Sequence, residues 1–370
     1  MNYPTLLPAL KSCAGVIQND LSDFFKEKKE EARLVDETLL QLTTILEEQV
    51  LRGGKRVRGF LVVVGSSLAK GSGDQDSTAA NLVRVSSAVE LYHSYLCALD
   101  DIADRDEMRH GGPTLEVVFR TLYPEISPQA QTHFYRTLAE FTSALLGTYA
   151  TDALRSAELK DSKLNKILKL INQVSISQPM AGWMIHYKQN QEDIQTVSED
   201  RFIKGLELVT AQYTFTSPLL IGLAQAGHPT EHDPVADLLH AYGKAAGTAF
   251  QMRDDEIGMF GDPAVTGKPI GNDLREGKKT LLLQHAWKHG SSEDKTVISS
   301  AINTDFSRET YEEIVKIMKK TGAIENSELK KQQFAAKALS ILDELETMDL
   351  DAKQIQILRE LTQYTIERDH

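Results

Sequence analysis

LYHSYLCALDDIADRDEMRHGGPT, residues 91–114, is the stretch that decides what fold and chemistry this chain is expected to have. It begins with mostly apolar residues and reaches four acidic positions, 100, 101, 104 and 106, within one short run. Residues four apart share one helix face, so Asp100 and Asp104 are expected to lie one turn apart. Two carboxylates at the end of an apolar helix are costly unless a cation lies between them. Mg²⁺ fits that need, because it is usually held by one or two protein carboxylates together with water and phosphate oxygens.

A second acidic segment favours this interpretation over a solvated helix end, which is the common alternative for a single acidic cluster. Residues 250–280 read FQMRDDEIGMFGDPAVTGKPIGNDLREGKKT, with Asp254 and Asp255 ending another apolar helix. Three lysines, at 268, 278 and 279, follow in a glycine-rich stretch. Two acidic helix ends with basic loops predict a site for a metal–diphosphate substrate.

Composition narrows the class of protein. The chain has 370 residues, 41% of them hydrophobic, with a formal net charge of -12, which is typical of a globular protein with a large core. The acidic balance argues against nucleic acid as the main partner, so the positive charge that a diphosphate needs must be local. Cys13 and Cys97 belong to no metal-type cluster, which favours a reducing compartment.

No segment indicates secretion or membrane insertion. The N-terminus lacks a basic region followed by a sustained apolar core, and no apolar run approaches the roughly eighteen residues of a membrane span. We therefore expect a cytoplasmic protein without an integral membrane span.

Apolar periodicity predicts a chain that is almost entirely α-helical. Helical spacing runs through residues 5–50, and Gly53-Gly54 ends that region. Ser127-Pro128 marks another helix start, 71–77 reads as a loop, and charged amphipathic helices fill 290–370. Because no linker divides the chain, residues 1–370 are expected to form a single domain, with 290–370 as a variable helical cover.

Six segments together carry a family resemblance. They are GGKRVRG at 53–59, ELYHSYLCALDDIAD at 90–104, RHGGPT at 109–114, TAQYTFTSPLLIG at 210–222, QMRDD at 251–255 and GKPIGNDLREGKKT at 267–280. In their order and spacing, the chain resembles the trans-prenyl diphosphate synthases, which build geranylgeranyl and related diphosphates head to tail. The resemblance implies an all-α, isoprenoid-synthase-type helical bundle around a central apolar cavity, and a homodimer.

The reaction implied by this resemblance joins an allylic diphosphate to isopentenyl diphosphate. Ionisation of the allylic C–O bond leaves a carbocation and a diphosphate, whose growing charge must be stabilised while water is kept away. The resemblance implies three Mg²⁺ ions per site. Their expected ligands are Asp100 and Asp104, together with Asp254 from across the cavity. The sequence alone supports only more than one ion.

Other acidic residues are given supporting roles. Asp101 and Asp255 are expected to reach the metals through water or from behind the ligands, so Asp255 is counted with the metal-binding residues. Asp273 resembles a carboxylate that orders metal-bound water, although a local turn bond explains it about as well. Asp106 falls outside the motif and is expected to be a solvated loop acid.

Basic and polar residues are assigned to the two diphosphates. Arg109, Lys268 and Lys278 match positions that contact the allylic diphosphate, and Lys279 is a weaker candidate. Lys55, Arg58 and His93 match positions that hold the second diphosphate without metals. Thr210 and Gln251 match positions that line the allylic site, or pair with helix backbone. Arg56 is expected to point to solvent, and Arg275 to pair with Asp273 or Glu276. The residues expected to carry catalysis are Asp100, Asp101, Asp104, Arg109 and Lys268.

Four positions depart from the family pattern. His110 stands where a second arginine is usual, so the grip on isopentenyl diphosphate is expected to be weaker or pH-dependent. Val209 replaces a lysine, Gly258 replaces the last acid of the second motif, and Leu99 replaces a histidine. These changes leave open a slower enzyme or a subunit that needs a partner. Both motifs keep their leading acids, so we favour activity.

Product length is predicted from the helix before Asp100. Tyr95 lies five residues upstream, where its ring would form the floor of a pocket of limited depth, while its neighbour Leu96 is not aromatic. Tyr92 lies about one turn further and is a second barrier. By resemblance, this pattern and the absence of a two-residue insertion favour geranylgeranyl diphosphate, C20. Both tyrosines are also compatible with ordinary core packing.

Three other functions remain open. A farnesyl or longer-chain synthase would differ from a C20 synthase only in the residues that form the floor of the product pocket. Val209 and His110 suggest the alternative of a weakly active or regulatory subunit of a heteromeric synthase. A class I terpene cyclase shares the fold, but would not need GGKRVRG, because it has no second diphosphate to hold.

Overall fold

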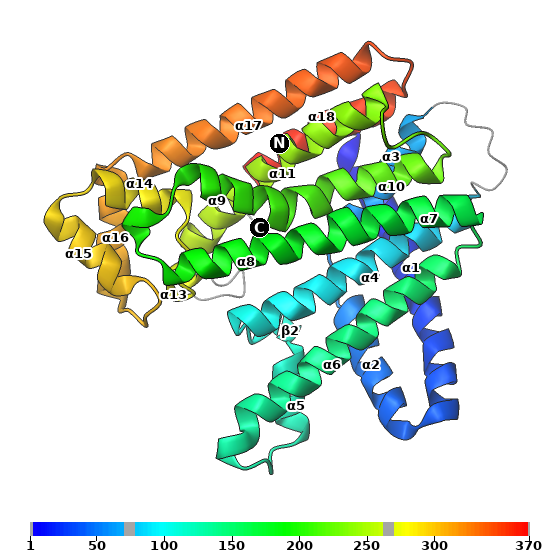
Figure 1. The fold of residues 1–370 in the computed structure, drawn as a ribbon, viewed down its shortest axis with the longest axis horizontal. Helices are drawn as coiled ribbons and strands as arrows, with labels where there is room; N and C mark the ends of the chain where they lie inside the picture. The colour runs from blue at the N-terminus through cyan, green and yellow to red at the C-terminus, as the bar shows by residue number, and fades with distance from the viewer. Residues whose placement is uncertain (1–2, 70–77, 262–269, 369–370) are drawn as a thin grey trace. The chain divides into compact units, whose positions relative to one another are not determined.

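Nearly all the regular structure of the described residues is helical, which confirms the predicted α-class (Figure 1). The computed structural model describes residues 3–69, 78–261 and 270–368. The predicted loop at 71–77 lies outside them. The contacts divide the chain into two compact units, Met1–Lys169 with Pro218–Pro229, and Leu170–Ser217 with Thr230–His370. We call these unit 1 and unit 2. The predicted single domain stays a prediction.

Unit 1 is arranged around one long helix, α4, which packs against α1, α3 and α6. Figure 1 shows α4 in cyan with α6 beside it. The helices of this unit are α1 (Leu6–Val35), α2 (Glu37–Leu51), α3 (Val57–Leu68), α4 (Ala79–Asp104), α5 (Leu115–Leu122), α6 (Pro128–Arg155), α7 (Asp161–Leu170) and most of α10 (Ser217–Gln225). The predicted helix start at Pro128 is confirmed.

Local signals fix both ends of α4. The hydroxyl of Thr78 accepts a hydrogen bond from the backbone N–H of Asn81, which caps the helix start. At the other end, Arg105 adopts a left-handed conformation with φ of 59° and stops the helix directly after Asp104. The acidic run therefore occupies the last turn of an apolar helix, as predicted.

A small hairpin, which the sequence did not predict, follows α4. Strands β1 (Met108–Arg109) and β2 (Gly112–Pro113) pair antiparallel, with Met108 opposite Pro113. His110 and Gly111 form the turn with φ values of 50° and 73°, the left-handed conformation that two-residue hairpin turns require. Strands of two residues show no alternation, so periodicity could not reveal them.

Unit 2 is arranged around α11, which packs against η3, α17 and α18. Its elements are η1 (Ile171–Ser177), α8 (Gln178–Gln191), η2 (Ile194–Thr196), α9 (Glu199–Leu206), η3 (Glu207–Thr216), α11 (Pro234–Phe260), α13 (Asn272–Arg275), α14 (Leu281–His289), α15 (Ser292–Ala301), α16 (Arg308–Lys320), α17 (Ala323–Glu346) and α18 (Ala352–Glu367). The segments η1 and η3 are π-helices, a form often found at functional sites.

Asp233 and two glycines explain how α11 is placed. The carboxylate of Asp233 accepts hydrogen bonds from the N–H groups of Val235 and Ala236, both at 3.0 Å, which caps the helix start. A Cβ atom at Gly243 or Gly247 would overlap with atoms of η3, so these glycines let the two helices approach backbone to backbone. This contact fixes η3 against the half of α11 that leads to Asp254 and Asp255.

Residues 290–368 are mostly helical, as predicted, and they contribute to the core of unit 2. Lys331 of α17 is 1% exposed, and its ammonium lies 2.6 Å from a carboxylate oxygen of Glu256 on α11. Ser327 donates a hydrogen bond to the other oxygen of the same carboxylate. In the described ranges, no helix combines the length and the apolar character that crossing a bilayer requires.

Candidate active site

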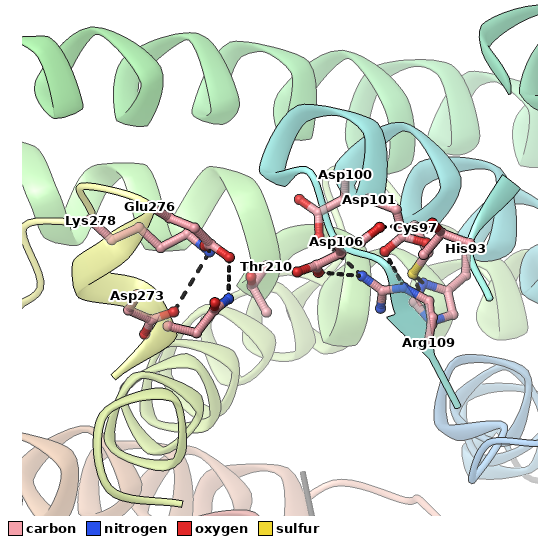
Figure 2. A network of polar contacts seen from close by, with 12 residues as sticks. His93, Cys97, Asp100, Asp101, Asp106, Arg109, Thr210, Asp273, Glu276 and Lys278 are labelled. Atoms are coloured by element: carbon pink, nitrogen blue, oxygen red, sulfur yellow. Dashed lines mark hydrogen bonds and ion pairs between the residues drawn. The ribbon is translucent and has the colours of Figure 1, made fainter. Parts of the chain in front are cut away.

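In unit 1, the last turn of α4 and the hairpin form an acidic cluster around Arg109, which Figure 2 shows. Its Nε donates a hydrogen bond to Oδ1 of Asp101 at 2.5 Å. One terminal guanidinium nitrogen lies 3.5 Å from Oδ2 of Asp100 and 4.0 Å from Oδ2 of Asp106. The structure thus brings Arg109 together with the first aspartate motif, while Asp104 completes that motif at the end of α4.

The pKa of Asp101 is raised by its surroundings in this cluster. Burial, only partly offset by Arg109 and reinforced by the charges of Asp100 and Asp106, raises the pKa of Asp101 to about 6. Its side chain is 6% exposed, so the carboxylate faces the guanidinium and not solvent. A carboxylate placed in this way is suited to orient Arg109, and its predicted position behind the metal ligands stays a prediction.

Asp106 is not the solvated loop acid that the sequence predicted. Its side chain is only 9% exposed and faces Arg109. The backbone explains why, because the N–H of Asp106 donates to the carbonyl of Asp101 at 2.9 Å and folds the chain back over the helix end. The spacing of the first aspartate motif gave no signal for this residue, since it lies two positions past the end of α4.

The hairpin that carries Arg109 is held by the end of α2. Gln49 and Arg52 each donate a hydrogen bond to the carbonyl of Pro113, at 2.8 and 2.6 Å. The guanidinium of Arg52 also lies against Gly112, where any Cβ atom would overlap with it. The sequence did not predict this role for Gln49, Arg52 or Gly112, because the partners are separated by sixty or more positions in the chain.

Arg58 and His93, both predicted to hold the second diphosphate, lie together in unit 1. A guanidinium nitrogen of Arg58 lies 3.0 Å from Nε2 of His93. Since arginine only donates, Nε2 accepts and the ring proton lies on Nδ1, 3.4 Å from the sulfur of Cys97. Burial, reinforced by Arg58 and Arg109, holds the pKa of His93 well below its usual range. His93 is therefore neutral at neutral pH.

Arg56 does not point to solvent, contrary to the prediction. It is 6% exposed and donates to the side chain of Gln18 at 2.7 Å and to the carbonyl of Val50 at 2.6 Å. Glu90 lies 3.7 Å away and also accepts from the N–H of Gly59. Arg56 thus joins α1, α2, α3 and α4, while Lys55 and Arg58 beside it remain partly exposed.

His110 lies beside the glycine pair that precedes Lys55. A Cβ atom at Gly54 would be 3.9 Å from Nε2 of His110. Burial and then the charges of Arg109, Arg56 and Arg52 lower the pKa of His110. A lowered pKa favours the neutral imidazole, and the weaker grip compared with an arginine stays a prediction.

The tyrosines predicted to set product length lie between α4 and α6. The hydroxyl of Tyr92 is 2.9 Å from the hydroxyl of Thr151, and the residue is 8% exposed. The ring of Tyr95 lies against Gly147, where a Cβ atom would be 3.4 Å from Cδ2. Leu96 is 2% exposed and belongs to the core.

In unit 2, Thr210 and Gln251 form a chain of hydrogen bonds to the second aspartate motif. Thr210 of η3 donates to the side-chain oxygen of Gln251 at 2.6 Å. The amide nitrogen of Gln251 then donates to Oδ1 of Asp255 at 3.0 Å. Both bonds join side chains, so in them neither residue pairs with helix backbone, the alternative that the sequence left open. That the two residues line the allylic site stays a prediction.

Asp255 lies in a strongly acidic environment. Burial raises its pKa well above the usual value, and the charges of Asp273 and Asp254 raise it further, against the opposing effects of Gln251 and Lys278. Asp273 comes from α13, and its carboxylate fills the space beside Gly258. A divalent cation at this point would offset the repulsion between these carboxylates.

Lys278 lies at this acidic cluster, and its neighbour Lys279 does not. Its ammonium is 2.5 Å from an oxygen of Glu276 and 3.7 Å from Oδ1 of Asp273 (Figure 2). Lys279 instead is 4% exposed and donates to the carbonyls of Gln189 and Asn190, so its role is structural.

Two further predictions for this loop have different outcomes. Arg275 was predicted to pair with Asp273 or Glu276, but it lies 3.0 Å from Asp305 and 4.0 Å from the centre of the Phe306 ring. That prediction is wrong, because the short helix α13 directs Arg275 toward the segment before α16. Lys268, predicted to be catalytic and to bind the diphosphate, lies outside the described residues.

Val209 has a packing explanation. A Cβ atom at Gly182 of α8 would overlap with Cγ2 of Val209, so the valine lies at a close contact between α8 and η3. The lysine that the family has at this position is therefore replaced by an apolar contact between helices.

The acidic residues fit a hard divalent cation. All the predicted ligands are carboxylates, the donors that Mg²⁺ prefers. Among the described residues, no group of three or more His, Cys, Asp or Glu side chains forms a metal cage by itself. Mg²⁺ commonly completes its shell with water and substrate phosphates, so two small carboxylate groups suit it.

Comparison with known proteins identifies the family. A sequence model of the polyprenyl synthetase family matches residues 40–318. The geranylfarnesyl diphosphate synthase of Aeropyrum pernix is 27% identical over 85% of this chain and 91% of its own length. The geranylgeranyl diphosphate synthase of Saccharolobus solfataricus is 28% identical over 85% of this chain and 87% of its own.

A solved structure agrees with this result. The geranylgeranyl pyrophosphate synthase of Corynebacterium glutamicum, crystallised with isoprenyl diphosphate and magnesium, is 26% identical, with a TM-score of 0.88 over 97% of this chain and 99% of that one. The chain belongs to the polyprenyl synthetase family. The all-α fold of the isoprenoid-synthase type is thereby confirmed, and so is the predicted class of enzyme, a transferase of prenyl groups.

Proposed function

We propose that this chain condenses isopentenyl diphosphate with an allylic diphosphate to form a trans-prenyl diphosphate, with geranylgeranyl diphosphate (C20) as the main product. The observation that carries the proposal is the cluster in which Arg109 contacts Asp100, Asp101 and Asp106 at the end of an apolar helix. A related structure was crystallised with isoprenyl diphosphate and magnesium, which supports the same substrate chemistry here.

In this proposal, separate groups of residues bind the metal ions, the allylic diphosphate and isopentenyl diphosphate. Asp100, Asp104 and Asp254, with Asp255, hold three Mg²⁺ ions, which when bound offset the charge of the departing diphosphate. Arg109 and Lys278, together with Lys268, bind the allylic diphosphate, and Asp101 and Asp273 orient these groups. Thr210 and Gln251 line the same site. Lys55, Arg58, His93 and His110 bind isopentenyl diphosphate, with neutral His93 positioning Arg58 by accepting its hydrogen bond.

Product length rests on the floor of the proposed tunnel. Tyr95 packed on Gly147, with Tyr92 anchored by Thr151, supports a barrier at about one to two helical turns from Asp100. The relatives carry both geranylfarnesyl and geranylgeranyl names, so the comparison supports the synthase class more strongly than any one length. Homodimer formation and a cytoplasmic location also remain predictions from the resemblance and the composition.

Purified chain, incubated with Mg²⁺, radiolabelled isopentenyl diphosphate and dimethylallyl, geranyl or farnesyl diphosphate, tests the proposal. Elongated products identified by mass spectrometry, with a C20 maximum and none after chelation by EDTA, are expected. Products that contain no label from isopentenyl diphosphate would indicate a terpene cyclase. Elongation only after addition of a second protein would indicate a subunit of a heteromeric synthase.

A further inference from the structure

Arg368, the residue that follows α18, makes three different contacts with the end of α11. Its guanidinium forms an ion pair with Asp254. The same group lies over the ring of Phe250, 4.0 Å from its centre. Its carbonyl accepts a hydrogen bond from Nε of Arg253 at 2.8 Å. The sequence gave no indication of these contacts, because 114 positions separate Arg368 from Asp254.

The two side chains of this ion pair differ in their exposure to solvent. The side chain of Arg368 is 12% exposed, and that of Asp254 is 35% exposed. The backbone N–H of Arg368 donates to the carbonyl of Tyr364 at 3.0 Å, so the residue caps the end of α18 directly. A guanidinium remains charged throughout the accessible pH range, so Arg368 brings a permanent positive charge to Asp254.

From this geometry we propose that Arg368 is a built-in counter-ion that competes with a divalent cation for the carboxylate of Asp254. The inference rests on the proposed function, in which Asp254 is a metal ligand. A carboxylate oxygen that accepts from a guanidinium has less electron density and less free space for a cation. A cation that takes the oxygen paired with Arg368 displaces the guanidinium, and one at the other oxygen is repelled by its charge, so the two equilibria are coupled. Arg368 is thus a positioning residue that weakens metal binding before the substrate arrives.

Direct binding of Mn²⁺ to the full-length chain without substrate tests this proposal. A background with Asp100→Asn and Asp104→Asn leaves the second motif as the main carboxylate group, and free Mn²⁺ is measured by electron paramagnetic resonance. Arg368→Ala is expected to tighten Mn²⁺ binding about five- to tenfold, within the usual range for coupled sites. Arg368→Lys, which keeps the charge, is expected to stay within about twofold of the background.

Matched variants separate competition from a general structural effect. Arg359→Ala changes another arginine of α18, which contacts Asp343 and Glu346, and is expected to leave Mn²⁺ binding unchanged. With Asp254→Asn present, Arg368→Ala should have no further effect. Should Arg368→Ala fail to fold, Arg368→Gln keeps much of the side chain's length and is expected to show the same gain. Unchanged or weaker binding in a folded Arg368→Ala or Arg368→Gln variant overturns the proposal.

The binding measurement is independent of the elongation assay. A wild-type chain that binds Mn²⁺ but makes no elongated product would refute the proposed function while the effect of Arg368 could still be measured. Conversely, an active synthase whose Mn²⁺ affinity does not respond to Arg368 would refute only the counter-ion role.

Discussion

The carboxylate of Asp273 fills the space that a side chain at Gly258 would need. A Cβ atom built on Gly258 would overlap with Oδ2 of Asp273, although the two residues come from different helices, α11 and α13. Gly258 stands where the last acid of the second motif is usual. The carboxylate of Asp273, on α13, therefore lies next to the position where the motif lacks its last acid. The charge of Asp273 also contributes to the raised pKa of Asp255.

We predict that Gly258→Ala lowers kcat by about tenfold, because it displaces Asp273, and a shift of roughly an ångström in a group that orients the site is enough to cost that much. Asp273→Asn should lower kcat by a similar factor. The double variant should be no slower than Asp273→Asn alone, since residues that act through one contact are not additive. Steady-state kinetics on the three variants measures this. Fully multiplicative losses would show that Gly258 acts independently of Asp273.

Arg109 is predicted to be intolerant of a conservative change. Its planar guanidinium contacts Asp101 through Nε and Asp100 and Asp106 through a terminal nitrogen, which one ammonium group cannot reproduce. Arg109→Lys should lower kcat/KM for the allylic substrate by about 100-fold, or about 2.7 kcal/mol of transition-state stabilisation. Arg120→Lys on α5, where the arginine is 49% exposed, serves as the control. Equal values for Arg109→Lys and wild type would remove Arg109 from the proposed site.

The sequence predicted the helices and the two aspartate motifs well, because both depend on local spacing. Periodicity located α4 and α11, and the acids of the first motif lie at the end of α4, as predicted. Asp254 and Asp255 were also predicted to end a helix, but α11 continues to Phe260. The sequence did not predict the buried side chain of Asp106 or the pairing of Arg275 with Asp305. Those outcomes depend on a tight turn in one case and on packing of a four-residue helix in the other.

The same limit applies to contacts over long chain separations. Arg56 was expected to be solvated because its neighbours Lys55 and Arg58 have a plausible substrate role. Its burial follows only from the arrangement of Gln18, Val50 and Glu90 around it. Such a contact leaves no periodic trace in the sequence.

His93 is predicted to make the chain less stable in mild acid. Burial and the charge of Arg58 lower its pKa in the folded state, so only the unfolded state takes up the proton as the pH falls through about 6.5. The unfolded state then binds more protons, and the free energy of unfolding falls with decreasing pH by at most about 1.4 kcal/mol per pH unit from this group. His93→Gln should remove this part of the slope.

Denaturant unfolding at pH 7.5 and pH 5.5 measures this effect. The loss of unfolding free energy between the two pH values should be smaller for His93→Gln than for the wild type. His133→Gln changes an exposed histidine of α6 and should behave as the wild type does. An unchanged pH slope in His93→Gln would mean that His93 titrates in the same range in both states.

Tyr95 is predicted to limit the length of the product. Its ring lies on Gly147, a residue without a side chain, so nothing on α6 at this point would replace the ring if it were removed. Tyr95→Ala should therefore extend the proposed tunnel and shift products toward lengths above C20, while Tyr95→Phe, which keeps the ring, should not. Tyr92→Phe removes the hydrogen bond to Thr151 but keeps the size of the side chain, and should leave the length unchanged. Chromatography of the dephosphorylated products measures the distribution. The same distribution from Tyr95→Ala and wild type would place the floor elsewhere and leave Tyr95 as an ordinary contact between α4 and α6.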